Sequence, residues 1–239
     1  MPRLVLLFVI LFWIAASFLF PLNRFFLPNA VSLVGTVLNT SFLLDLLMNL
    51  SITFIRVGAG TVIALLVAIP LGILMAKNAA ARSLAEPVID FVRGIPIAML
   101  FPIFIFFVGL GELSRILMVI TLAFPIVALS VYLSARPNED NSERIAYFNL
   151  RKGLLSRETL LRMVIWEALP GVLTGTRLAI SLGLVVVIVT EMYFVASSGI
   201  GWRAFRAYEN FQIDSLYFYI FIVGLSSMLV NRFISRLKF

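Results

Sequence analysis

Long apolar stretches alternate with short polar segments along the chain, and inside the apolar stretches there is no two-residue alternation. A helix needs about 20 apolar residues to cross a hydrocarbon core roughly 30 Å thick, and it satisfies its backbone hydrogen bonds internally. The pattern therefore predicts an all-α fold, a polytopic membrane bundle in which the whole chain, 1–239, is a single transmembrane domain. Six spans are expected, over residues 4–20, 52–76, 88–110, 114–134, 172–195 and 215–233.

The first expected span, "LVLLFVILFWIAASFLF", follows Arg3 and has to be distinguished from a signal peptide. Its apolar run of 17 residues is longer than the 7–15 typical of such a peptide. No convincing cleavage site follows it. We therefore expect a helix that stays in the mature protein.

The lysines and arginines lie mainly on alternate connecting segments, which predicts how the chain is oriented in the membrane. With the amino terminus in the cytoplasm, twelve of them fall inside and four outside, as the positive-inside rule requires. Both termini are then cytoplasmic. The inside set is Arg3, Lys77, Arg82, Arg136, Arg144, Arg151, Lys152, Arg157, Arg162, Arg232, Arg236 and Lys238, and the outside set is Arg24, Arg115, Arg203 and Arg206.

Composition supports a membrane protein and narrows its chemistry. Hydrophobic residues make up 62% of the chain and the mean hydropathy is +1.07, against about 45–50% apolar residues in soluble domains. The net charge of +7 is explained by topology and by attraction to membrane lipid, without nucleic-acid binding. The sequence contains no Cys and no His, so it offers no thiol nucleophile and no imidazole ligand, and we expect neither a catalytic residue nor a metal site.

Two of the expected spans carry small residues every four positions, which places them on one helix face. In a membrane such a row lets a second helix approach closely. Gly and Ala are also common in membrane helices generally, but the length of the first row favours packing. The rows are Gly60, Ala64, Ala68, Gly72 and Ala76 in one span, and Gly171, Gly175, Ala179 and Gly183 in the other.

One sizeable polar insertion, over residues 135–170, interrupts the apolar pattern on the cytoplasmic side. It reads as two short helices around Gly153, a residue that suits a tight turn between helices. The stretch "RKGLLSRETLLRMVIW", residues 151–166, has one apolar and one basic side. A helix of this kind either lies on the membrane surface or docks into a groove of a partner protein.

This insertion resembles the signature loop of permeases of binding-protein-dependent ABC importers. In that family a Glu-Ala-Ala is followed by a turn glycine, an amphipathic helix, a Leu-Pro and a further proline. Here Gly153 matches the turn glycine and Pro170 the last proline. Tyr147, Phe148 and Asn149 stand in place of Glu-Ala-Ala, and Ile165-Trp166 in place of Leu-Pro, so half of the motif is degenerate.

Two further segments resemble the nitrate, sulfonate, taurine and bicarbonate group of these permeases. They are "VRGIPIAMLFPIFIFFVGLGELSRI", residues 92–116, and "TEMYFVASSGIGW", residues 190–202. The group has a basic residue and a proline before the third span, a Gly-x-Gly-Glu turn after it, and a Glu ahead of a Gly-Ile/Leu-Gly loop. The resemblance covers residues 50–235 and implies a permease of the inner (plasma) membrane that imports an oxyanion or small organic acid.

The resemblance also implies partners and a coupling helix. Such a permease pairs with a second copy, identical or homologous, on two ABC ATPase subunits that bind ATP and Mg, and it receives solute from a periplasmic or lipid-anchored binding protein. This chain lacks a phosphate-binding G-x-x-x-x-G-K-[ST] sequence, so we expect no cofactor on it. The residues expected to couple to the ATPase are Tyr147, Asn149, Arg151, Gly153, Leu154, Arg157, Glu158, Leu161 and Arg162.

Three residues are candidates for the substrate path: Arg93, Pro96 and Glu191. Ionisable groups in or beside spans are costly and often functional, although a pair at the membrane interface would equally explain them. A proline frees a backbone carbonyl that must then face protein or a wet cavity. The alternatives to an importer are a polytopic membrane enzyme, or a channel not coupled to ATP.

Overall fold

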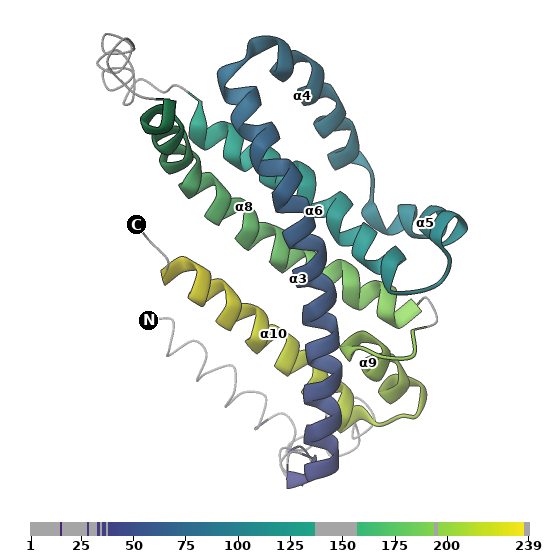
Figure 1. Ribbon diagram of the computed structural model, residues 1–239. Helices are drawn as coiled ribbons and strands as arrows, with labels where there is room; N and C mark the ends of the chain where they lie inside the picture. The colour runs from purple at the N-terminus through teal and green to yellow at the C-terminus, as the bar shows by residue number, and fades with distance from the viewer. Residues whose placement is uncertain are drawn as a thin grey trace. The chain divides into compact units, whose positions relative to one another are not determined.

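The computed structural model describes residues 38–136, 157–193 and 196–236, together with a few isolated positions nearer the amino terminus. These ranges are helical and contain no strand, which confirms the predicted all-α fold. The elements are α3 (Thr40–Lys77), α4 (Ala79–Gly94), the short 3-10 helix η2 (Ile97–Leu100), α5 (Phe101–Val108), α6 (Glu112–Ala135), α8 (Arg157–Tyr193), α9 (Ile200–Glu209) and α10 (Ile213–Arg236) (Figure 1).

The described helices form two compact units. One, called here the α9 unit, contains the described residues up to Phe54 together with Ile188–Leu229. The other, the α6 unit, contains Ile55–Val187 and the described residues from Val230 onward. Three helices, α3, α8 and α10, continue from one unit into the other.

Helix α6 is the most buried span of the α6 unit, and the small-residue row of α3 packs against it. A Cβ atom added to Gly60 would lie 2.5 Å from Val119 Cβ, and one added to Gly72 would lie 2.6 Å from the Ala128 carbonyl oxygen. Between these glycines, Ala64 and Ala68 are fully buried. The row therefore brings the two helix backbones together, as the sequence predicts.

The second small-residue row, on α8, packs against α6 as well. A Cβ atom at Gly175 would lie 3.0 Å from Val127 Cα, and one at Gly171 would overlap the Ser130 carbonyl. At Gly183 it would lie 3.5 Å from Val119 Cγ1. Two helices with small residues thus enclose α6, whose own contacting side chains are mainly Val, Ala and Ser.

These contacts fix the directions of the helices. Gly60 meets Val119 and Gly72 meets Val131, so α3 and α6 run parallel. Gly171 meets Ser134 and Gly183 meets Val119, so α8 runs antiparallel to α6. Because α3 and α6 each span a membrane in the same direction, the chain between them must cross back.

That return crossing is a broken span and not the continuous helix predicted over 88–110. Helix α4 and the η2–α5 segment meet at an angle of 91° (Figure 1). Pro96 causes the break: it cannot donate a backbone hydrogen bond, and it drives Ile95 into an extended conformation with φ −82° and ψ 126°. Both arms contact α6.

The other predicted spans correspond to described helices, with different ends. The span expected over 52–76 lies within the longer α3, 114–134 within α6, and 215–233 within α10. The span expected over 172–195 belongs to α8, which begins much earlier, at Arg157. Of residues 4–20 the structure describes only Ala15, so the first expected span stays a prediction.

Candidate functional site

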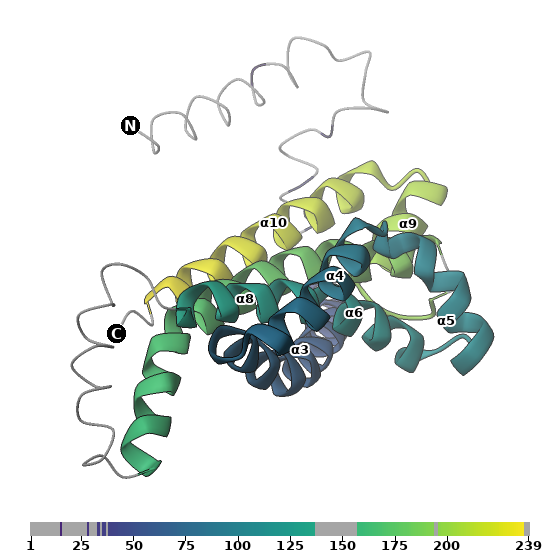
Figure 2. The same cartoon turned by 90° about the horizontal axis from the view of Figure 1, so that it is seen from above.

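The predicted coupling segment leads directly into a membrane span. The sequence suggested a separate helix over 151–165, but from Arg157 the chain is one α-helix to Tyr193, with Pro170 inside it. Its first turns project away from the rest of α8 (Figures 1 and 2). Arg157, Glu158, Leu161 and Arg162 fall on these turns, whereas Tyr147, Asn149, Arg151, Gly153 and Leu154 lie outside the described residues.

Side chains of α3 and α6 fix α8 just after the projecting turns. Lys77 Nζ, at the end of α3, lies 3.0 Å from Glu167 Oε2. Ser134 Oγ, at the end of α6, donates a hydrogen bond of 2.9 Å to the Glu167 carbonyl. Four residues later, Gly171 makes its close approach to α6. The part of α8 that follows the projecting turns is therefore held against α3 and α6 at Glu167–Gly171.

Arg93 and Pro96 both lie at the break between α4 and η2. Arg93 is in the last turn of α4, where its charge suits the negative end of the helix dipole. Its side chain is 47% exposed and lies 3.5 Å from Asp90 Oδ1, one helical turn earlier. Arg93 and Pro96 therefore lie together at this break, and their role in the substrate path stays a prediction.

Glu191, the third predicted residue, lies in the α9 unit and is fully buried. Thr53 Oγ1, on α3, lies 2.9 Å from each of its carboxylate oxygens. The backbone N–H of Gly201 donates a 2.9 Å hydrogen bond to Oε2. Its described contacts therefore lead to the start of α9 and to α3, and not to Arg93 or Pro96.

Three successive backbone donors at the start of α9 are bound by side chains. An isolated helix leaves its first N–H groups without partners. Here Gly199 N–H donates to Asn49 Oδ1 at 2.9 Å, Ile200 N–H to Thr53 Oγ1 at 3.0 Å, and Gly201 N–H to Glu191. Two residues of α3 and one of α8 thus cap α9. Asn49 and Thr53 were not predicted, although polar residues four positions apart in an apolar stretch were a usable signal.

The glycines of this turn allow the carboxylate to come close. Gly199 has φ +109°, in the region that glycine adopts at least cost. A Cβ atom there would overlap the Glu191 carboxylate, and one at Gly201 would lie 2.8 Å from Glu191 Cβ. Glu191 and the Gly199-Ile200-Gly201 turn, noted as a pattern in the sequence, therefore pack directly against each other.

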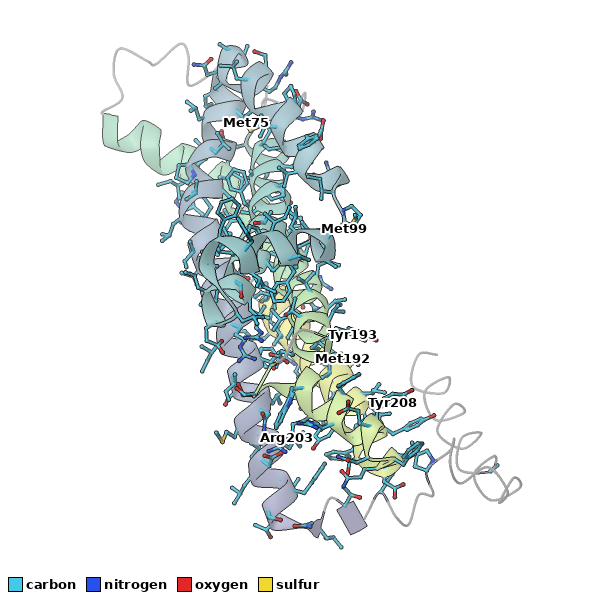
Figure 3. All side chains as sticks on the ribbon, turned by 90° about the vertical axis from the view of Figure 1, so that its right-hand side faces the viewer. Met75, Met99, Met192, Tyr193, Arg203 and Tyr208 are labelled. Carbon is cyan, nitrogen blue, oxygen red and sulfur yellow. The ribbon has the colours of Figure 1, made fainter. Side chains whose placement is uncertain are left out.

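Helix α9 has a face on α3 and an exposed face. Arg203 points towards α3 and pairs with Asp45, and it stacks on Trp202 at 4.6 Å from the ring centroid (Figure 3). On the exposed face, Tyr208 is 61% exposed. The Phe205 ring lies between those of Tyr193 and Tyr208, at 5.9 and 6.3 Å.

A buried arginine in the α6 unit forms a charged site that the sequence analysis did not predict. Arg56 on α3 is 2% exposed and forms a bidentate pair with Glu112, at 2.6 Å for Nε and 2.5 Å for the second contact. Arg115, also buried, donates to the Gly111 carbonyl at 3.1 Å. Arg56 belongs to neither the inside nor the outside set of basic residues, because it lies within the span expected over 52–76, yet a lone arginine in an apolar helix indicates a partner.

Comparison with known proteins identifies the family. Residues 68–238 match the family described as the inner membrane component of binding-protein-dependent transport systems. The chain belongs to this family of ABC importer permeases. It is a multi-pass integral membrane protein, and its family is one of transporter permeases, not of enzymes.

Several relatives and one solved structure resemble the permease. A protein of Methanocaldococcus jannaschii named as an ABC transporter permease is 30% identical over 82% of this chain and 71% of its own length. The taurine transport permease TauC of Escherichia coli is 25% identical over 77% of this chain and 65% of its own length. The formylaminopyrimidine transport permease ThiX of Halalkalibacterium halodurans is 24% identical over 99% of this chain and 92% of its own length. The methionine ABC transporter MetNI, inward facing, matches with a TM-score of 0.65 at 14% identity, covering 84% of this chain and 100% of the other; this likeness shows the fold.

Proposed function

We propose that this permease forms the translocation path of an ATP-driven importer for a small solute, and that ATP is hydrolysed on two separate ABC ATPase subunits, which carry ATP and Mg. A second permease copy, identical or homologous, completes the membrane part. A periplasmic or lipid-anchored binding protein delivers the solute. The complex lies in the inner membrane, with both termini of this chain in the cytoplasm.

The observation that carries the proposal is the continuity of α8. One helix contains the end of the predicted coupling segment, the contact of Glu167 with Lys77, and a membrane span. A partner that pushes on the projecting turns therefore moves a span directly. The basic residues Arg157 and Arg162 on those turns fit a soluble partner with an acidic groove.

The proposed solute is an oxyanion or small organic acid such as nitrate, a sulfonate, taurine or bicarbonate. The name of one relative, TauC, specifies taurine, and Arg93 supplies an exposed cation at the break between α4 and η2. ThiX supports a second candidate, a pyrimidine precursor, because it aligns with 99% of this chain. An uptake panel of nitrate, taurine, bicarbonate and formylaminopyrimidine separates the two, and import of the pyrimidine alone would overturn the anion.

The coupling role is tested at Gly153, the predicted turn glycine. The sequence predicts a tight turn at Gly153, and a side chain would strain such a turn by about 1 kcal/mol or more and redirect the segment. We expect Gly153→Val to leave the permease in the membrane but to lose ATP-driven uptake, or to lose the ATPase on purification. The matched control is Gly224→Val in α10, where an added Cβ atom meets nothing within 4 Å. Full uptake by Gly153→Val would refute the coupling assignment.

A further inference from the structure

We propose that Glu191 is a positioning residue of the permease: its carboxylate latches the first turn of α9 to α8 and α3, so that α9 moves together with α8. This inference rests on the proposed function, because it takes α8 as the helix that the ATPase moves. It assigns to Glu191 a role distinct from contact with the solute.

The latch consists of three side chains bound to three successive backbone donors. Asn49, Thr53 and Glu191 receive the N–H groups of Gly199, Ile200 and Gly201, respectively. All three side chains are at most 3% exposed. Since no water reaches these donors, loss of one acceptor leaves a buried N–H group unsatisfied, which is more costly than the bond itself is favourable.

Glu191 is the central member because it joins all three helices. It belongs to α8, receives Gly201 N–H from α9, and is hydrogen-bonded by Thr53 of α3. Its negative charge also lies at the positive end of the α9 dipole. The glycines at 199 and 201 leave no room between the turn and this carboxylate, so the turn cannot shift while Glu191 keeps its place.

Because Glu191 lies on α8, the latch connects α9 to the helix that the ATPase is proposed to move. Glu191 lies in the last turn of the helix whose first turns are the end of the predicted coupling segment. A displacement of α8 therefore reaches α9 through the Glu191 carboxylate, and with it the half-buried side chain of Phe205 and the exposed side chain of Tyr208. The second connection, between Arg203 and Asp45, ties α9 to α3 but not to α8.

Two cysteine reporters test the latch in the complete complex, and the natural chain has no cysteine to interfere. Ala204→Cys reports docking, because Ala204 is 8% exposed and lies in the core shared by α9 with Leu46 and Tyr219. Tyr208→Cys, on the exposed face, is labelled with a polarity-sensitive dye. A difference in dye fluorescence between the nucleotide-free complex and the complex trapped with ATP and vanadate reports movement of α9.

We expect Glu191→Ala to raise the rate of N-ethylmaleimide labelling at Ala204→Cys by about tenfold or more, since it removes a charge-assisted acceptor. It should also abolish the nucleotide-dependent signal at Tyr208→Cys. Glu191→Gln keeps an acceptor oxygen and should keep labelling near the unsubstituted rate. The control Glu209→Gln removes an acid of α9 that pairs with Arg206 at 3.5 Å and should change neither reporter.

The outcomes separate the latch from the proposed function. Unchanged labelling of Ala204→Cys in Glu191→Ala would overturn the latch. Faster labelling with a persisting nucleotide signal would overturn the coupling of α9 to α8, because a purely structural role predicts that pattern. If the otherwise unsubstituted complex gives no nucleotide signal, the coupling fails together with the proposed function, whereas the docking role of Glu191 is still decided by Ala204→Cys.

Discussion

Two buried charges of this permease have identified partners. Glu191 accepts hydrogen bonds from the Thr53 hydroxyl and from the Gly201 backbone N–H at the start of α9. Arg56 forms an ion pair with the Glu112 carboxylate. A buried charge without such partners would be costly in a membrane. Each site should therefore respond to the loss of its own kind of partner.

The Arg56 pair gives a prediction about stability. Glu112→Gln removes the carboxylate that forms the bidentate pair with Arg56 and should lower the thermal midpoint of the permease in detergent. Because the Glu112 side chain is 59% exposed, we expect a cost of about 1–3 kcal/mol, below that of a fully buried pair. The double variant Arg56→Met with Glu112→Gln should regain part of the loss, since the buried cation that lost this carboxylate is then absent too.

The matched control for this pair is the exposed one between Asp90 and Arg93. Asp90→Asn should shift the midpoint little, because pairs of this kind contribute about 0–1 kcal/mol. A double variant less stable than Glu112→Gln alone would show that Arg56 is held by other contacts.

At the scale of elements, the packing of α6 depends on small residues of its neighbours α3 and α8. Both rows of Gly and Ala could be read from the sequence, because their four-residue spacing is a property of the helix itself. Which helix they contact could not, since the partner is set by tertiary packing. The same holds for the latch: the Glu and the Gly-Ile-Gly turn were visible in the sequence, but Asn49 and Thr53 are more than 130 residues away from it.

Two glycines of α3 provide a matched test of this packing. In a helix, Gly→Ala is intrinsically favourable by about 1 kcal/mol. At Gly58, where an added Cβ atom meets nothing within 4 Å, the substitution should keep or raise the thermal midpoint. At Gly72 the new atom would lie 2.6 Å from the Ala128 carbonyl oxygen, so α3 and α6 must separate and the midpoint should fall. Equal midpoints for the two variants would contradict close packing at Gly72.

At the scale of the whole molecule, the hydropathy pattern predicted the fold class and four of the described spans. It could do so because the length and apolar content that a span needs are properties of each segment by itself. It failed where one local residue outweighed the apolar pattern: Pro96 divides an apolar stretch into two arms at 91°. The coupling segment was expected to be separate from the span after it, yet α8 joins them, with Pro170 tolerated inside the helix.

The parallel packing of α3 and α6 turns the predicted orientation into a test with four positions. Ser41, near the start of α3, and Leu113, at the start of α6, lie on one side of the membrane, and Ser83 on α4 follows the end of α3 on the other. Ser235 belongs to this second side, because the first turns of α10 pack on Phe42 at the start of α3 and Ser235 is at the far end of α10. The positive-inside rule places the second pair in the cytoplasm.

Single cysteines at Ser41 and Leu113 should therefore react with a membrane-impermeant maleimide in intact cells, whereas those at Ser83 and Ser235 should react only after permeabilisation. Reaction of the opposite pair would invert the orientation but keep the broken span. Reaction of Ser83 and Leu113 from the same side would mean that α4 and α5 enter and leave the membrane on one face, which the shared direction of α3 and α6 does not allow.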